Sequence, residues 1–198
     1  MRDDGATSSG PHLAHLTSIQ LLHLDHNEIR SSGVKALAPH LAHMTSITHV
    51  DLSFNVMGEE GAKSLGPHLA QLASIQVLNH NDAELGDDGV NALGRHLAHL
   101  TLIQQLHLKA NGISAHGAKS LGPHLAYLSS ITRLDLSFNR IGDDGAKSLG
   151  PHLAWLTSIQ QLDINFNPVR GLGPQRCDDG AAALASNLAH LKLLRIET

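Results

Sequence analysis

Glycine recurs every 28 residues through most of this 198-residue chain, at Gly5, Gly33, Gly61, Gly89, Gly117 and Gly145. Two leucine columns keep the same interval, one from Leu37 to Leu149 and one from Leu41 to Leu153. The next glycine of the column, Gly180, comes 35 residues after Gly145, which places a seven-residue insertion near 168–180. This self-similarity predicts a single domain, 1–198, of about seven stacked units, because one unit alone cannot bury its apolar face.

Within each unit the hydrophobic period changes. The stretch RLDLSFN at 133–139 alternates between apolar and polar residues, which is typical of a short strand. After Gly145 the apolar residues follow helical spacing, at Ala146, Leu149, Leu153 and Leu156. Each unit is therefore predicted to contain one strand and one helix, which places the chain in the α/β class.

The segment LDLSFNRIGDDGAKSLGPHLA, from Leu134 to Ala154, resembles the L-x-x-L-x-L-x-x-N-x-L motif of leucine-rich repeats. The 28-residue length and the G-x-x-x-L-x-x-x-L helix are similar to the ribonuclease-inhibitor-like subclass, which includes Ran GTPase-activating protein. The resemblance implies a right-handed α/β solenoid, a horseshoe arc with a parallel sheet on its concave face and helices on its convex face. It also implies a binding surface on the concave strands.

Proline and histidine occupy fixed places in the repeated helix. In the predicted helix 61–72, Ala62, Leu65, Leu69 and Leu72 form the buried stripe and Pro67 lies almost opposite it, so a kink or a break into two turns is expected on the solvent side. The column His12, His40, His68, His96, His124 and His152 is interpreted as packing against a glycine or small residue of a neighbouring unit. A ladder of metal ligands is the alternative. Acidic pairs such as Asp87–Asp88 are expected in solvent at helix starts.

Variable residues on the strands are the candidates for partner contact. They are His23, His49, Asp51, His107, Arg133, Asp135 and Asp163. His23 beside Asp51, and His107 beside Asp135, are expected on neighbouring strands about 5 Å apart. Surface hydrogen bonding is the simpler interpretation of these pairs. The alternative is a metal held by His23 and Asp51 with His49 or Asp25.

All three phenylalanines of the chain share one column, at Phe54, Phe138 and Phe166, where the strand ends. Either these rings fill the loop layer, or they form an aromatic contact strip for a protein partner.

Two irregularities interrupt the pattern. His80 replaces a buried leucine, and Ala83 replaces the turn asparagine found at Asn27, Asn55, Asn111, Asn139 and Asn167. The unit is either decayed, or remodelled so that Asn81 or Asp82 substitutes for the missing amide. The insertion near 168–180 carries Arg170 and Arg176 and is predicted to be an exposed loop, which is a candidate binding segment.

Composition narrows the function. The net charge of −4 gives no basis for binding nucleic acid or an anionic membrane, and no stretch is apolar enough to span a bilayer. No catalytic motif is present, so neither catalytic residues nor a cofactor is expected. We therefore expect a non-catalytic, cytoplasmic scaffold that binds a protein on its concave face. Regulation of a small GTPase, by fold analogy with Ran GTPase-activating protein, is the alternative, and a metal-binding protein is a third possibility. The terminal units lack polar shielding, which predicts self-association.

Overall fold

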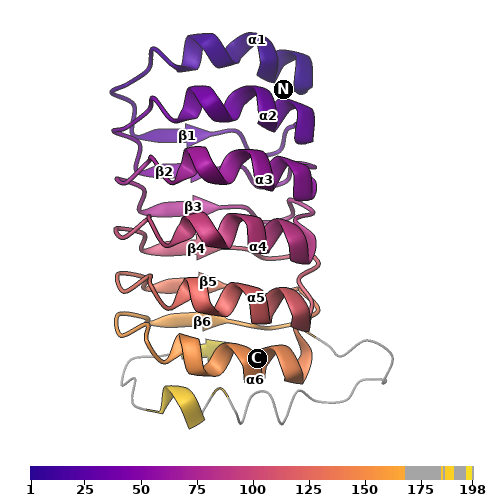
Figure 1. Cartoon of the computed structure of the whole chain (residues 1–198), viewed down its shortest axis with the longest axis vertical. Helices are drawn as coiled ribbons and strands as arrows, with labels where there is room; N and C mark the ends of the chain where they lie inside the picture. Colours follow the sequence, from indigo (N-terminus) through magenta and orange to yellow (C-terminus); the bar gives the residue numbers. More distant parts are fainter. Residues whose placement is uncertain (168–183, 185, 190–194, 198) are drawn as a thin grey trace.

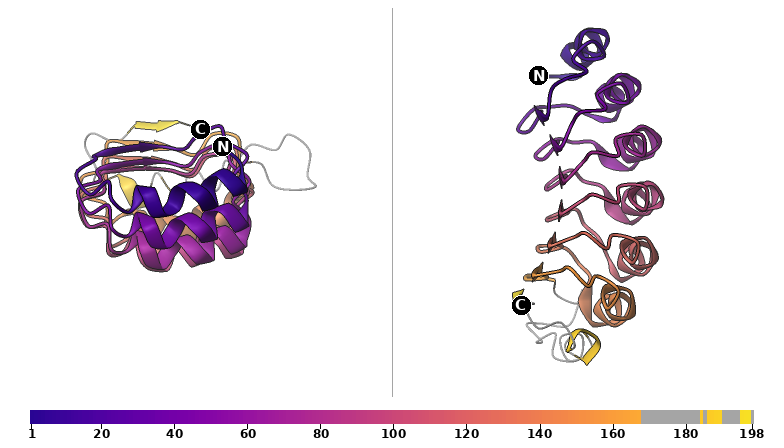
Figure 2. Two further views of the ribbon diagram at one scale, coloured as in Figure 1. Left: turned by 90° about the horizontal axis from the view of Figure 1, so that it is seen from above. Right: turned by 90° about the vertical axis from the view of Figure 1, so that its left-hand side faces the viewer.

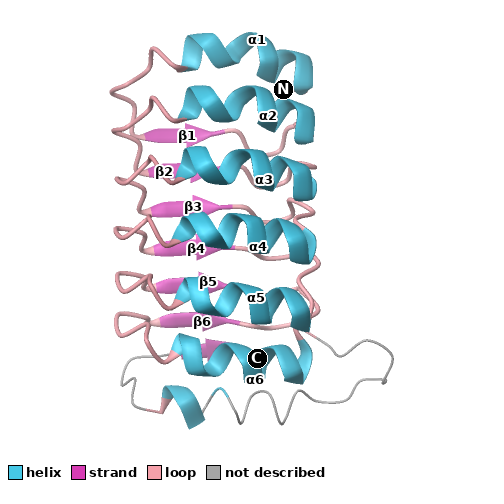
Figure 3. Cartoon of the chain, viewed as in Figure 1, coloured by secondary structure: helices cyan, strands magenta, loops and turns pink. Residues whose placement is uncertain are grey.

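The computed structural model describes residues 1–167, 184, 186–189 and 195–197. Helices and strands alternate from α1 to β6 (Figures 1 and 3), in the order α1 (Asp3–Leu13), β1 (Leu21–His23), α2 (Ser31–Leu41), β2 (His49–Asp51), α3 (Gly58–Leu69), β3 (Val77–Asn79), α4 (Gly86–Leu97), β4 (Gln105–His107), α5 (Ala115–Leu125), β5 (Arg133–Asp135), α6 (Gly142–Leu153) and β6 (Gln161–Asp163). The last strand is β7 (Arg195–Glu197). The insertion near 168–180, with Arg170 and Arg176, lies outside the described residues. In the part described, every helix is too short or too polar to cross a bilayer.

The strands form one parallel sheet in chain order, from β1 to β7. Between β1 and β6 each strand residue pairs with the residue 28 positions further on, as Leu21 does with His49. Figure 2 shows the helices on the outer side of an arc and the strands on its inner side. The predicted α/β solenoid, with its parallel sheet on the concave face, is therefore confirmed. The register stays constant because every unit from β1 to β6 has the same length.

The repeated helix differs in its bounds from the prediction. α3 covers Gly58–Leu69 rather than 61–72, and Leu72 follows in a turn whose N–H donates to the Leu69 carbonyl at 2.9 Å. Leu72 is nevertheless fully buried, as predicted for the stripe. Pro67 is exposed and lies inside a continuous helix, so the expected break into two turns does not occur. The proline is tolerated because it sits in the last turn, on the solvent side, where water can hydrate the carbonyl that loses its partner.

The turn asparagines tie neighbouring units together. The Asn55 amide donates to the carbonyls of Leu52 and Ser53 in its own unit and to that of Leu24 in the preceding unit. Its Oδ1 accepts a hydrogen bond from the Ile29 N–H at 3.1 Å. Asn111, Asn139 and Asn167 repeat this arrangement. Each amide thus satisfies buried backbone groups that would otherwise be desolvated without a partner.

The histidine column packs between helices, as predicted. A Cβ built on Gly10, Gly66, Gly94 or Gly122 would lie 2.4–2.9 Å from the Cδ2 atom of a histidine in the next unit, which is His40, His96, His124 or His152 respectively. The side chain that meets Gly150 is Asn187. Glycine therefore provides the space that each imidazole ring occupies, and the column is an inter-repeat contact.

Asp87, in the first turn of α4, does more than face solvent, which corrects the expectation for the acidic pairs. Its Oδ1 accepts a hydrogen bond from the Ser114 N–H at 2.7 Å, and its Oδ2 accepts one from the Ser114 hydroxyl at 2.5 Å. At the start of the array, the Oδ1 of Asp3 accepts a hydrogen bond from the Arg30 N–H, and its Oδ2 accepts one from the Ser32 hydroxyl. These carboxylates therefore connect the start of one helix to the start of the next.

The irregular unit keeps the register predicted for it. His80 is fully buried in the leucine layer, and neither ring nitrogen has a hydrogen-bond partner in the part of the chain described. Ala83 is also fully buried and offers no side-chain acceptor to the Met57 N–H, the equivalent of Ile29. Asn81 does not replace the lost amide, because its Oδ1 accepts from Lys109 N–H in the following unit. In this unit the described residues therefore include neither the turn amide of position 83 nor a partner for the buried imidazole.

Candidate partner-binding surface

The predicted contact residues occupy the first and third positions of the three-residue strands, and the middle residue is buried. His49 and Arg133 hold first positions, and His23, Asp51, His107, Asp135 and Asp163 hold third positions. These side chains line the concave face, with His23 exposed and most of the others half-buried. Asp135 is the exception, because only 7% of it is exposed. The alternation follows from the two-residue period of a strand.

Several side chains at the third strand position also accept hydrogen bonds from the backbone. An oxygen of Asp51, Asn79, Asp135 or Asp163 accepts a hydrogen bond from the N–H two residues further on. Such local bonds favour a turn and end the strand. Sequence reasoning missed this role, although short polar side chains at a constant place before a turn signal it. The same residues therefore serve the fold and line the hollow.

His107 and Asp135 form one of the two predicted pairs, with Nδ1 and Oδ2 4.0 Å apart. Burial alone would raise the pKa of Asp135, but His107 and the hydroxyl and N–H of Ser137 stabilise the carboxylate, so its pKa falls to about 2. Close by, the Arg133 Nε atom is buried and has no hydrogen-bond partner among the described residues.

The other predicted pair belongs to a larger cluster. A ligand atom from each of His23, Asp25 and Asp51 lies within 4.8 Å of the other two. His26 contacts Asp25, with its Nδ1 3.0 Å from Oδ2, and this contact lowers the pKa of Asp25. His49 is not part of the cluster, and its Nδ1 lies 2.8 Å from the Thr48 hydroxyl. Of the two third ligands expected from the sequence, His49 or Asp25, the cluster contains Asp25.

The three phenylalanines are exposed and do not fill the loop layer. Phe54, Phe138 and Phe166 are 47%, 48% and 67% exposed. Each has a positive φ, of 54° to 56°. In the same column His26, Asp82 and Ala110 also have positive φ, of 51°, 49° and 54°. Phe138 stacks on Phe166 with ring centroids 4.4 Å apart, and Phe54 stacks on His26 at 4.1 Å. We call Phe54, Phe138 and Phe166 the aromatic rim.

Two features of the surface were not predicted as sites. Lys109 places its Nζ 4.6 Å from the centroid of the Phe138 ring, which adds a cation to the aromatic rim. Tyr127 and Trp155 are 65% and 69% exposed, in the turns that precede β5 and β6. They belong to the amino ends of the parallel strands, whereas the aromatic rim follows the carboxyl ends. Their place in a variable column was the signal for them.

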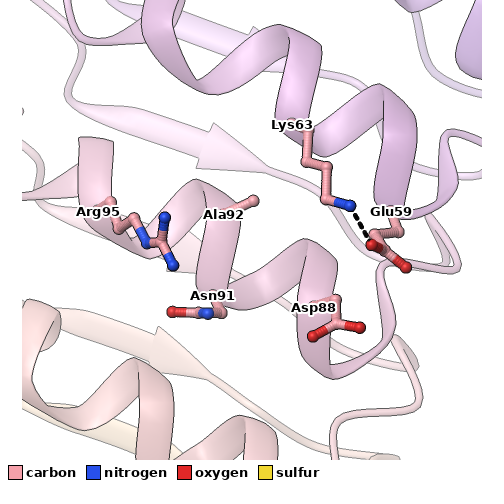
Figure 4. A pocket seen from close by; sticks show the side chains of 6 residues that line it. All are labelled: Glu59, Lys63, Asp88, Asn91, Ala92 and Arg95. Atoms are coloured by element: carbon pink, nitrogen blue, oxygen red, sulfur yellow. Dashed lines mark hydrogen bonds and ion pairs between the residues drawn. The ribbon is translucent and has the colours of Figure 1, made fainter.

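On the convex face, a groove of about 390 Å³ lies between α3 and α4 (Figure 4). It is lined by Glu59, Lys63, Asp88, Asn91, Ala92 and Arg95. Lys63 is paired with Glu59 and Glu60. Among the described residues no carboxylate lies within ion-pair distance of Arg95, which stands where α3 and α5 carry proline. The lining is polar and of mixed charge, so it lacks the apolar surface of a typical small-molecule site.

Comparison with known proteins agrees with the repeat and the fold. The family model described as Leucine Rich repeat matches residues 15–38, 43–66 and 127–150. These three segments are leucine-rich repeats, and their units are of the ribonuclease-inhibitor-like kind. No curated protein matches it in sequence.

Two solved structures have the same fold. One is "Leiomodin-1 Actin-Binding Site 2 (ABS2)", with a TM-score of 0.57 and 15% identity over 80% of this chain and 90% of that one. The other is the tropomodulin C-terminal domain of Caenorhabditis elegans, with a TM-score of 0.56 and 13% identity over 81% and 96% of the two chains. At such identities the similarity establishes the shared repeat fold.

Proposed function

We propose that this chain is a non-catalytic module that binds a protein partner through its concave strand face and aromatic rim. The observation that carries the proposal is the exposure of three phenylalanines at backbone positions with positive φ. A non-glycine residue in this conformation is strained by about 1–3 kcal/mol. Phe54, Phe138 and Phe166 stay 47%, 48% and 67% exposed, so burial within the chain compensates for this strain only in part.

The fold itself does not require phenylalanine there. Asp82 and Ala110 occupy the same column with φ of 49° and 54°, so small or polar residues adopt the same backbone. Phe138 and Phe166 stack on each other, yet they remain 48% and 67% exposed, which leaves much of their surface available to a partner. Aromatic side chains that are rigid and partly exposed are enriched in protein–protein interfaces, where a partner buries them.

The remaining candidates extend this surface along the array. His23, His49, Asp51, His107, Arg133, Asp135 and Asp163 line the hollow beside the aromatic rim. We propose that they select the partner through hydrogen bonds and charge, while the rings supply apolar contact. Arg170 and Arg176 in the insertion remain predicted contacts.

The test compares two edges of the sheet. Phe138→Ala/Phe166→Ala removes two exposed rings from the aromatic rim, and Tyr127→Ala/Trp155→Ala removes two from the opposite edge. A partner captured by the unchanged chain is purified, and its Kd is measured with both variants. The rim variant should weaken binding by at least about tenfold, because interface anchors contribute more than 1 kcal/mol each. Equal affinity of the rim variant and the unchanged chain would refute the proposal.

Actin is the first defined partner to test, because the similar leiomodin-1 structure is described as an actin-binding site. Co-sedimentation with filaments and titration of labelled monomers would give the affinity directly. The alternative, regulation of a small GTPase, is tested separately by GTP hydrolysis, on which a scaffold should have no effect.

A further inference from the structure

The cluster at the start of the array gathers nitrogen and oxygen donors from two strands. His23 ends β1, Asp25 follows it in the next turn, and Asp51 ends β2 opposite His23. One nitrogen and two carboxylate oxygens, one from each residue, lie within 4.8 Å of one another. At that spacing a single cation can contact all three atoms. The side chains of His23 and Asp25 are 64% and 36% exposed, so an ion can enter from solvent.

Surrounding hydrogen bonds hold two of these donors in place. Asp51 accepts from the Ser53 N–H at 2.9 Å, from the Ser53 hydroxyl at 2.6 Å and from the Asn79 amide at 2.9 Å. A carboxylate offers about four lone-pair positions, so one remains for a cation. Asp25 is oriented by the His26 ring at 3.0 Å. Ligands fixed in this way by an outer layer of hydrogen bonds are usual in metal sites.

The donor set selects the kind of ion. Imidazole nitrogen suits first-row transition cations, whereas calcium and magnesium prefer an all-oxygen set. We propose that His23, Asp25 and Asp51 form a binding site for a divalent transition cation of the zinc class, with His26 orienting Asp25. Three protein ligands leave at least one coordination position for water or for a side chain of a partner.

The array contains its own matched comparison, three units or 84 residues further on. His107 stands for His23, Asp135 for Asp51 and Ser137 for Ser53, but Lys109 replaces Asp25. Lys109 offers no carboxylate, and its Nζ, a donor without lone pairs, lies 4.6 Å from the Phe138 ring centroid. The second constellation should therefore reject a cation, and position 25 decides between the two outcomes.

The experiment is a calorimetric titration of the full chain with zinc chloride at pH 7 in a buffer that does not chelate zinc. The chain has 16 histidines, so stoichiometry in the presence of a weak competing chelator separates one built site from weak background binding. The variants are Asp25→Lys, which copies the second constellation, and Lys109→Asp, which copies the first. His49→Ala is the control, since His49 lies on the same face outside the cluster. Thermal unfolding of each apo variant checks that it is folded.

We expect one saturable zinc site in the unchanged chain and in His49→Ala. Asp25→Lys should weaken it by at least about tenfold, and Lys109→Asp should add a second ion. The absence of a saturable site in the unchanged chain, or undiminished binding by Asp25→Lys, would overturn the proposal. Unchanged stoichiometry in Lys109→Asp would overturn the inference that the third carboxylate decides. Partner binding by the aromatic rim is measured without metal, so the two proposals can fail separately.

Discussion

At the scale of single residues, His80 is the least satisfied side chain in the described core. It stands in the layer filled by Leu52 and Leu108 in the adjacent units, and its two ring nitrogens lack partners. Burial lowers the pKa of His80 to about 4, and Asp51 only partly opposes that effect. The native chain therefore holds a neutral imidazole, whereas the unfolded chain protonates the same residue near pH 6.5.

His80→Leu should stabilise the chain, and more so in acid. Removing a buried polar group without partners is worth about 1–3 kcal/mol at pH 7. The pKa of His80 is depressed in the folded state, so below pH 6.5 the unfolded chain takes up a proton that the folded chain does not. The free energy of unfolding of the unchanged chain therefore falls further as pH decreases from 6.5 toward 4. The stability gap between His80→Leu and the unchanged chain should widen by about 2 kcal/mol from pH 7 to pH 5. Urea unfolding at both pH values measures it, and a constant gap would contradict the argument.

At the scale of helices, the interface between units depends on a ring packed over a glycine. α5 and α6 contain the same sequence AKSLGPHLA, and His152 occupies the space beside Gly122. A Cβ at Gly122 would lie 2.6 Å from the His152 Cδ2 atom. Ala38 holds the equivalent position in α2, so the array can accommodate a methyl group by moving the ring.

The effect of Gly122→Ala on stability should change sign when His152 is also replaced by alanine. In the unchanged chain we expect a loss of about 1 kcal/mol, because steric strain exceeds the gain in helix propensity. With His152→Ala present, the same change should stabilise by about 0.5–1 kcal/mol, because only the propensity gain remains. A double-mutant cycle by chemical denaturation measures the coupling. Additive effects would show that the two residues do not interact.

At the scale of the whole molecule, the array is a series of units that contact only their neighbours. Cooperativity therefore passes through each interface in turn, and a weak interior unit divides the array. The unit with His80 and Ala83 combines an unpaired imidazole with a missing turn amide. Residues Gly117–Leu162 belong to near-identical units that keep the buried leucine and the turn asparagine.

Hydrogen exchange should follow this order. Among interior units, amides near residues 77–85 should exchange before those of Gly117–Leu162, because each local defect costs about 1–3 kcal/mol. The double change His80→Leu/Ala83→Asn should raise the unfolding midpoint and slow exchange in that unit toward its neighbours. Mass spectrometry of exchanged peptides gives both rates. Uniform exchange across the interior would mean that the defects are compensated.

The sequence by itself determined the features that recur with the 28-residue period. A constant 28-residue period fixes the parallel register, so the leucine layer, the burial of His80 and the packing of histidine over glycine could all be read from columns of residues. Tertiary structure decided what does not repeat. Asp25 joins His23 and Asp51, His49 does not, and Asp87 reaches Ser114, because these contacts depend on which side chains meet across two units. Whether the phenylalanines fill the loop layer was also decided only by the tertiary structure, in which all three are exposed. The backbone repeats with the period, whereas the side chains at variable positions meet different partners in different pairs of units.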